Sequence, residues 1–300
     1  MDGSHGDTAP AGLAQGSLIL VTGGTGTVGR ELLRRLPPGR AVRVMARHPA
    51  RLGTAGAHVH KVAGDYRDPR SLARALEGVR TAFLVTMGVG GDDDARFLRA
   101  AQTAEVQRVV KLSAAAVLDE RADDLITRRQ RANEDLLRAS GLQWTLLRPR
   151  AFASNALSWA PSVRAERTVR ALYGTSGNAC VDPRDVAEVA ARVLTEEGHA
   201  GCAYTLTGPE TLTAAGQTEQ LAGLLGVPLR FEELTPHQAR TALAARYPAP
   251  VVQALLESAE RQRAGAKAGV EDTVTQLTGR PAGTFRTWAR DHLAAFTPED

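Results

Sequence analysis

The sequence has little cysteine, few histidines and no long apolar run. Its two cysteines, Cys180 and Cys202, match neither the spacing of a metal site nor a disulfide framework, and its seven histidines are scattered along the chain. No apolar stretch approaches the roughly 20 residues that a membrane-spanning helix needs. The segment 1–16 is polar and rich in Gly, Ala and Pro, without the order of a signal peptide. We therefore predict a disordered leader over 1–16 in a cytoplasmic protein that binds no metal and no membrane.

Lysine is also scarce, because only Lys61, Lys111 and Lys267 occur among 37 basic residues. The arginines are interspersed among 33 acidic residues, and the net charge is only +4. A nucleic-acid-binding surface would instead gather its basic residues on one face. Neither a Gly-x-Ser-x-Gly nucleophile elbow nor a Gly-Lys-Ser/Thr phosphate loop is present. We therefore expect a small-molecule partner and no nucleic acid.

What the sequence does contain is a glycine-rich turn between an apolar strand and a helix. Leu18–Thr22 is apolar, Gly23-x-x-Gly26-x-x-Gly29 follows, and a helical pattern continues to Leu36. This spacing brings the backbone and a helix N-terminus close to a dinucleotide pyrophosphate. A tight strand-to-helix turn also needs glycine for structural reasons, but the position after a buried strand favours cofactor binding. The residues that we expect at the pyrophosphate are Gly23, Thr25, Gly26, Thr27, Val28 and Gly29.

Apolar strand-like runs alternate with helical patterns over the first half of the chain. The runs lie at 18–22, 41–46, 58–63, 81–86, 108–113 and 143–148, and the helical patterns at 29–36, 69–76, 92–104, 123–139 and 183–194. This alternation predicts an α/β doubly wound parallel sheet, a Rossmann fold. We expect the core over 17–155, with 174–208 returning to it through a strand at 204–207. A smaller, mostly helical substrate lobe is expected over 156–173 and 209–267, with little strand character, followed by a C-terminal helix and tail over 268–300.

The residues after the second strand indicate which cofactor is bound. Folds that prefer NADH place an acid there to bind the ribose 2′-hydroxyl. Here the segment carries Arg47 and Arg51 instead, whose guanidinium groups suit a 2′-phosphate. The alternative is an ordinary solvated turn. The pattern predicts NADPH as the cofactor, with NADH as the weaker possibility.

Three further motifs resemble the short-chain dehydrogenase/reductase superfamily, in its atypical NmrA-like branch with the NADPH:quinone oxidoreductases. They are Gly64-Asp-Tyr-Arg-Asp68, Glu134-x-x-Leu-Arg-Ala-Ser-Gly-Leu-Gln-Trp-Thr-Leu-Leu-Arg-Pro149 and Asp182-Pro-Arg-Asp-Val-Ala187. The resemblance covers 17 to about 208 and the segment around Trp288. It implies that Asp65 and Tyr66 flank the adenine, that Thr86 and Met87 line the cofactor cleft, and that Ser113 lies beside the nicotinamide. It also implies that Phe152 and Asn155 line the substrate pocket, although Phe152 is equally typical of a core aromatic and Asp65 of loop bonding.

The chain departs from this family at the catalytic positions. Most catalytic members carry Tyr-x-x-x-Lys, in which the tyrosine protonates the reduced carbonyl. The matching positions here hold Ile126 and Gln130, and the catalytic serine position holds Ala115. The catalytic residues are therefore unknown, and Ser113 is only a weak candidate.

Two explanations of this loss stay open. The substrate can supply its own proton or resonance stabilisation, which predicts an NADPH-dependent ketoreductase for a polycyclic aromatic ketone or quinone in antibiotic biosynthesis. The Arg-rich composition is similar to that of actinobacterial chains, and an angucyclinone ketoreductase of the simocyclinone pathway is similar in lacking the tyrosine and lysine. The other explanation is a non-catalytic NADP(H)-sensing regulator, with simple quinone reduction between the two. The oligomeric state stays open.

Overall fold

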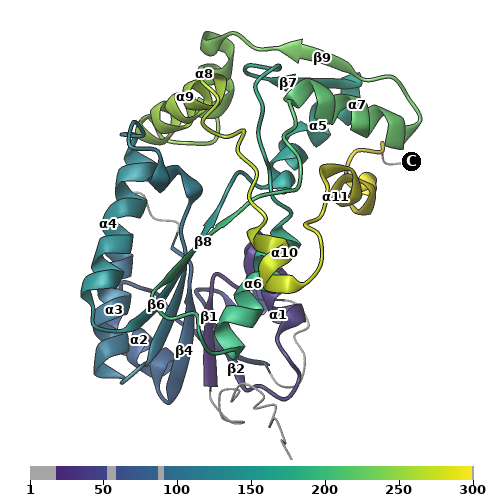
Figure 1. Ribbon diagram of the computed structural model, residues 1–300. Helices are drawn as coiled ribbons and strands as arrows, with labels where there is room; N and C mark the ends of the chain where they lie inside the picture. Colours follow the sequence, from purple (N-terminus) through teal and green to yellow (C-terminus); the bar gives the residue numbers. More distant parts are fainter. Residues whose placement is uncertain (1–17, 53–58, 87–90, 299–300) are drawn as a thin grey trace, which may run out of the picture.

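The structure, a computed structural model, describes residues 18–52, 59–86 and 91–298 of the 300-residue chain. Its centre is a parallel sheet of seven strands in the order β3-β2-β1-β4-β5-β6-β8 (Figure 1). The strands are β1 Leu18–Thr22, β2 Val42–Ala46, β3 Val59–Ala63, β4 Val79–Leu84, β5 Arg108–Leu112, β6 Gln143–Pro149 and β8 Cys202–Leu206. The predicted doubly wound α/β fold is confirmed, and so is the strand that returns to the sheet.

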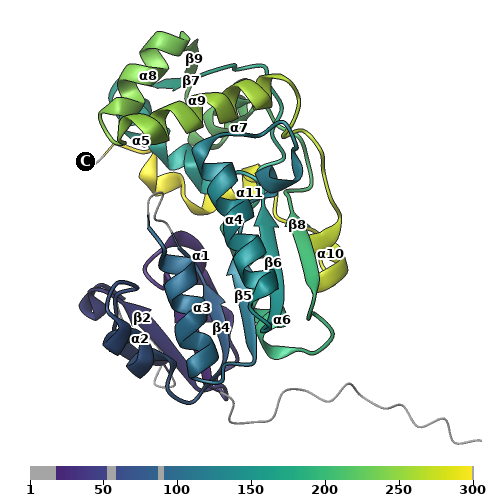
Figure 2. The ribbon, with the colours of Figure 1, turned by 90° about the vertical axis from the view of Figure 1, so that its left-hand side faces the viewer.

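Helices cover both faces of the sheet, which explains why its central strands are almost wholly apolar (Figures 1 and 2). One face carries α1 Thr27–Arg35, α6 Pro183–Thr195 and α10 Thr273–Thr278, and the other α2 Pro69–Leu76, α3 Asp93–Thr103 and α4 Leu125–Ala139. Each predicted core strand and helix is present, and its bounds differ from the prediction by at most two residues; His58 lies outside the described residues.

A smaller lobe lies beyond the carboxyl ends of the strands, at the top of Figure 1. It contains η3 Ala153–Trp159, α5 Ala160–Glu166, α7 Ala214–Leu225, α8 Pro236–Ala244 and α9 Ala249–Arg263. It also contains a two-stranded parallel sheet of β7 Thr168–Ala171 and β9 Arg230–Glu233. The expectation of little strand character is wrong at these two strands. Each strand has only four residues, and one of the residue pairs between them is the salt bridge of Arg170 with Glu232. The two segments therefore lack the run of apolar residues from which a strand is predicted.

The single C-terminal helix predicted within 268–300 is also wrong. The segment forms α10 and, after a break, α11 Phe285–Asp291 and η4 Leu293–Ala295. Gly279 ends α10 in the left-handed conformation at φ 73°, and Pro281 follows it, which is a common way to stop a helix. Trp288 and Phe296 are then buried in the core of the lobe.

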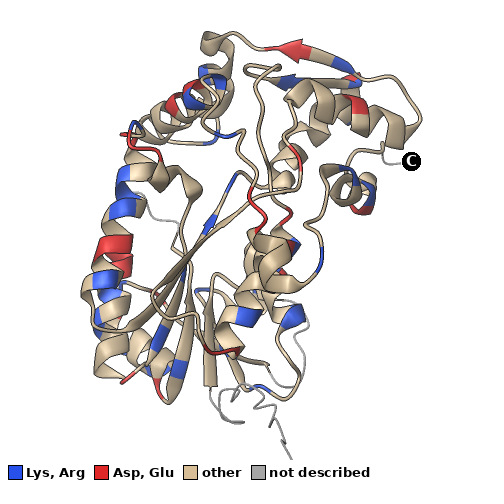
Figure 3. Ribbon diagram, viewed as in Figure 1, with Lys and Arg blue, Asp and Glu red and all other residues tan. Residues whose placement is uncertain are grey.

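Charged residues of both signs are interspersed over the helices, as Figure 3 shows along α4. Ion pairs between neighbouring turns account for part of this pattern, for example Arg138 with Asp135 and with Glu134. No helix in the described ranges is long and apolar enough to cross a membrane.

Candidate active site

The glycine turn leaves β1 in a conformation that brings the first turn of α1 against it. Gly23 has φ +68°, and its carbonyl accepts the N–H of Gly26 at 2.9 Å. A Cβ on Gly29 would lie 2.2 Å from the carbonyl oxygen of Gly23, so only glycine fits there. No side chain caps α1, and its first turn has no acidic residue. The turn therefore offers free N–H groups and the positive end of a helix dipole, which fits a pyrophosphate.

The other predicted residues of the turn differ in exposure. Thr25 is half-exposed and Thr27 is exposed, whereas the side chain of Val28 is buried in the core beneath α1. Val28 can therefore reach a ligand only through its backbone. The cofactor contacts of these residues stay a prediction.

Arg47 and Arg51 lie exposed directly after β2. The backbone N–H of Arg51 donates to the carbonyl of His48 at 3.0 Å, which starts the short η1 helix, Pro49–Leu52. This helix folds back toward the glycine turn, because a Cβ on Gly24 would lie 3.2 Å from Cδ2 of Leu52. The segment carries no carboxylate, so its geometry suits the predicted 2′-phosphate contact.

Asp65 and Tyr66 follow β3 and are held by local contacts. One oxygen of the Asp65 carboxylate accepts the N–H of Arg67 at 2.8 Å, as the loop-bonding alternative expects. The Tyr66 hydroxyl donates to the carbonyl of Val85 at 2.8 Å, and its ring meets Phe97 edge-on. Burial raises the pKa of Tyr66, so its hydroxyl stays protonated. Met87 lies outside the described residues.

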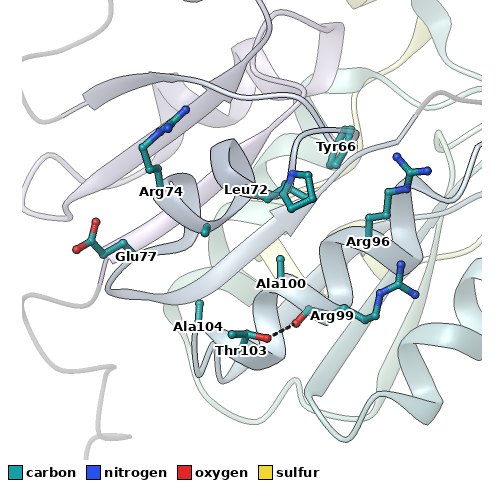
Figure 4. A pocket seen from close by; sticks show the side chains of 11 residues that line it. Tyr66, Leu72, Arg74, Glu77, Arg96, Arg99, Ala100, Thr103 and Ala104 are labelled. Carbon is teal, nitrogen blue, oxygen red and sulfur yellow. Dashed lines mark hydrogen bonds between the residues drawn. The ribbon is translucent and has the colours of Figure 1, made fainter.

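Tyr66 also closes one end of a cavity of about 650 Å³ between α2 and α3 (Figure 4). Leu72 and Ala100 form part of its apolar lining, and Arg96 and Arg99 lie at one side. Among the predicted cofactor-binding residues that the structure describes, only Tyr66 contributes to it. We therefore do not assign this cavity to the cofactor or the substrate.

Thr86 belongs to a buried ionic network that the sequence did not indicate. Its hydroxyl donates to Asp94 at 2.6 Å, and Nζ of Lys111 lies 2.5 Å from the other oxygen of that carboxylate. Lys111 is fully buried in β5. A lysine inside an apolar strand was the one feature of the sequence that could have indicated a buried ion pair. A buried ion pair with hydrogen bonds is costly to disturb, so the network holds the ends of β4 and β5 in place.

Ser113, directly after β5, is tied to a second buried carboxylate. Its hydroxyl donates to Oε1 of Glu134 at 2.6 Å, and Arg148 binds both oxygens of Glu134 at 2.9 and 2.6 Å. Burial acts to raise the pKa of Glu134, but the hydrogen bonds from Arg148 and Ser113 outweigh it and hold that pKa below its ordinary value. The proton of Ser113 is therefore committed to an ionised carboxylate. Ser113 is positioned as a hydrogen-bond acceptor and not as an acid.

The family's acid positions offer no proton donor. Ile126 and Gln130 are half-buried on α4, and Ala115 is buried in η2, Ala115–Leu118. Asp124 lies nearby but caps α4, accepting the N–H groups of Ile126 and Thr127. Among the described residues, no group of three His, Cys, Asp or Glu side chains could hold a metal ion.

Ala115 opens onto a second cavity, of about 420 Å³, at the carboxyl end of the sheet. Its lining consists of Ala115, Leu118, Asp119, Arg121, Arg150, Arg261, Ala264, Gly265 and Ala266. Arg150 follows β6 and donates from Nη1 to the carbonyl of Ala266 at 3.0 Å. Arg261, at the end of α9, donates to Asp124 on the core at 2.6 Å. The lobe thus forms one side of the cavity, whose lining combines three arginines and Asp119 with small apolar residues.

Phe152 and Asn155 do not line this cavity. Phe152 is half-buried against the main core, and its backbone bridges to Val181. Asn155 is exposed in η3. Their contact with a substrate stays a prediction.

Asp185, in the third motif, has a structural environment. Its buried carboxylate accepts the N–H of Gly283 at 2.8 Å and a hydrogen bond from Arg280 at 2.8 Å. These contacts tie α6 to the segment that precedes α11.

Comparison with known proteins shows the family of this chain. Residues 23–197, more than half of the chain, match a family described as NAD(P)H-binding. The chain is 56% identical over 282 residues to the (4-alkanoyl-5-oxo-2,5-dihydrofuran-3-yl)methyl phosphate reductase of Streptomyces griseus subsp. griseus. The matched region covers 94% of this chain and 100% of that protein. It is 34% identical over 284 residues to the NAD(P)H azoreductase of Xenophilus azovorans, covering 93% of this chain and 99% of that one.

Solved structures agree with these matches. The NADPH-dependent quinone oxidoreductase QOR2 of Escherichia coli, solved with NADPH, has a TM-score of 0.79 at 25% identity and covers 92% of this chain and 99% of its own. The predicted cofactor class is thereby confirmed. The chain belongs to the NAD(P)H-binding family and is an NAD(P)H-dependent oxidoreductase.

Proposed function

We propose that the protein uses NADPH to reduce the ring double bond of a (4-alkanoyl-5-oxo-2,5-dihydrofuran-3-yl)methyl phosphate. The observation that carries this proposal is the 56% identity, over the whole relative, to the Streptomyces griseus reductase named for that compound. The absence of a proton donor at Ile126 and Ala115 supports it, because this substrate does not need one.

The chemistry of the ring explains why. The C3=C4 double bond is conjugated at C4 with both the lactone carbonyl and the alkanoyl ketone. A hydride that adds to C3 leaves its electron pair at C4 as an enolate, which is delocalised over two carbonyl oxygens. A proton from water then forms the second new bond at C4. General acid catalysis, which contributes roughly 100- to 10,000-fold elsewhere, is therefore dispensable.

The residues of the chain then have binding and positioning roles. The glycine turn holds the pyrophosphate, Arg47 holds the 2′-phosphate, and Ser113 borders the nicotinamide position. When bound, NADPH supplies the hydride. Holding donor and acceptor in place can account for roughly 7 to 11 kcal/mol of the barrier, which is enough for a reductase without a protein acid.

The polycyclic aromatic ketone that the sequence predicted, including an angucyclinone and a role in antibiotic biosynthesis, is less well supported. The cavity beside Ala115 has three arginines and Asp119 among its lining residues besides small apolar ones, which suits a small molecule with a charged group better than a wholly apolar one. Quinone reduction is the second candidate, because the fold matches a quinone oxidoreductase along nearly its full length.

The deciding experiment supplies the purified protein with NADPH deuterated at the transferable position. The substrates are the butenolide phosphate, a set of quinones and a set of hydroxyaryl ketones. We expect rapid NADPH oxidation with the butenolide phosphate and deuterium at C3 of the saturated lactone, located by NMR. Deuterium on the side-chain carbinol carbon would identify a ketoreductase, and turnover of quinones alone would overturn the proposal in favour of the second candidate.

A further inference from the structure

We propose that the cavity between η2 and the end of α9 binds a phosphate monoester, with Arg150 and Arg121 as its principal ligands. The proposal rests on the proposed function for the identity of the natural ligand. The site itself is argued from the geometry of the cavity.

The cavity lies where a substrate would have to be. Arg150 directly follows β6, and Ala115 lies just beyond β5, so both belong to the carboxyl edge of the sheet. Ligands of open α/β sheets bind in the crevice at this edge. Because Ala115 has only a methyl group, the wall beside the nicotinamide position leaves room for a ring.

The positive charges of the cavity are not balanced by its own carboxylates. Asp119 is the acidic residue in the lining, and it accepts the N–H of Arg121. Arg261 is already paired, to Asp124 at 2.6 Å and to Asp119 at 3.6 Å. Within the described ranges, no carboxylate forms a salt bridge with Arg121 or Arg150, although the charges of Glu271 and Asp119 act on Arg150 at longer range.

Arg150 also has a donor without an acceptor. Its Nη1 is bound to the carbonyl of Ala266, but its Nε is buried and has no hydrogen-bond partner among the described residues. Buried polar groups are nearly always paired, so the hydrogen bonding of Arg150 is incomplete among the described residues. A phosphate has three acceptor oxygens, which match the planar donors of two arginines.

Lys267 does not line the cavity, but it follows the lining residue Ala266 in the chain and interacts electrostatically with Arg261 and Arg150. Its Nζ lies 3.4 Å from the amide oxygen of Gln262. Burial, together with the charges of Arg261 and Arg150, lowers the pKa of Lys267 to about 8. These cations are therefore close enough to repel one another, and a dianion bound near them would relieve that repulsion.

The test compares the butenolide phosphate with the same butenolide carrying a free hydroxymethyl group. The variants are Arg150→Gln and Arg121→Gln, and the control is Arg246→Gln, an exposed arginine between α8 and α9. We expect kcat/KM for the phosphate ester to fall roughly 10- to 100-fold in each site variant, while kcat/KM for the alcohol stays at the wild-type value. Equal losses on both compounds would overturn the site, because a structural role affects both. Arg121 is exposed, so its variant still tests the site if Arg150→Gln does not fold.

A binding measurement separates this proposal from the proposed function. The protein is first saturated with NADP⁺, so that its own phosphate sites are filled, and inorganic phosphate is then titrated by calorimetry. We expect binding in the wild type and in Arg246→Gln, and at least a tenfold weaker binding in Arg150→Gln. Phosphate binding without turnover of the butenolide would retain the site and overturn the function. Equal phosphate affinity in all variants would overturn the site.

Discussion

The glycine turn and the cationic cavity both suit phosphate groups, but they are built from different chemistry. At the turn, one continuous segment presents backbone N–H groups and the end of α1, and no side chain caps it. At the cavity, guanidinium groups arrive from three separate segments, at Arg121, Arg150 and Arg261. Recognition at the turn therefore depends on shape, and recognition at the cavity depends on charge.

This difference predicts different sensitivities. Backbone donors do not titrate, so pyrophosphate binding at the turn should change little with pH. The cavity has one exposed and two half-buried arginines, and Lys267 lies next in the chain to one of its lining residues, so its ligand affinity should respond to ionic strength and to pH. Variants of each region test this contrast.

The largest effect is expected for Gly29→Ala. The new Cβ would meet the Gly23 carbonyl oxygen at 2.2 Å, and two further backbone atoms at 2.8 and 2.9 Å, so α1 must move away from the turn. We expect NADPH affinity to fall roughly 100-fold, equivalent to about 3 kcal/mol, in a fluorescence titration. Gly39→Ala is the control, because its Cβ would meet nothing within 4 Å. An unchanged affinity in Gly29→Ala would show that the shape of the turn does not control cofactor binding.

The next effect concerns the buried carboxylate of Glu134, which binds Ser113 at the end of β5. Glu134→Gln leaves Arg148 and Arg138 without their shared charge, and we expect the free energy of unfolding to fall by about 2 kcal/mol at neutral pH. The pKa of Glu134 is below its ordinary value of 4.5, so the unfolded chain binds more protons as the pH falls through this range. Glu134 therefore stabilises the fold above about pH 4.5, and this stabilisation is lost on acidification. Urea unfolding across pH should show a weaker acid dependence in the variant; the same dependence would contradict the network.

A smaller effect is expected for Arg47→Asp. Arg47 lies near the glycine turn, but we expect it to recognise the cofactor through its charge. Removing one exposed guanidinium and adding a carboxylate should lower the NADPH-to-NADH ratio of kcat/KM roughly tenfold or more. Steady-state kinetics with both cofactors measures the ratio. Arg30→Asp, an exposed site on α1, controls for the change of charge alone. If both variants shift the ratio equally, Arg47 has no specific contact with the 2′-phosphate.

The same contrast explains what the sequence could predict. The core strands and the glycine turn carry their signals within a few neighbouring residues, as apolar runs and as the spacing of Gly23, Gly26 and Gly29. Arg47 could be predicted for the same reason, since it stands at a fixed distance from the turn. These features depend on local geometry that the sequence alone specifies.

The cavity could not be predicted, because no local pattern brings its parts together. Arg150 directly follows the motif that ends at Pro149, but Arg261 reaches the cavity only through the packing of α9 on α4. The pairs Lys111 with Asp94 and β7 with β9 likewise join segments that are distant in the sequence. Contacts between distant segments produce no periodic pattern in the sequence, so they could not be predicted from it.

The smallest effect is a proton taken up when phosphate binds the cavity. The pKa of Lys267 is lowered to about 8 by burial and by the charges of Arg261 and Arg150, although Asp124 acts in the opposite direction. A dianion nearby raises that pKa again, so at about pH 8.5 the neutral fraction of Lys267 takes up a proton on binding. Calorimetry in two buffers with different ionisation enthalpies should give an uptake of roughly half a proton at this pH, where free phosphate is already a dianion and has no proton to release on binding. Lys267→Met should bind phosphate more weakly without any proton uptake. Uptake that persists in this variant would assign the titration to another group and remove Lys267 from the site, while leaving Arg150 and Arg121 in it.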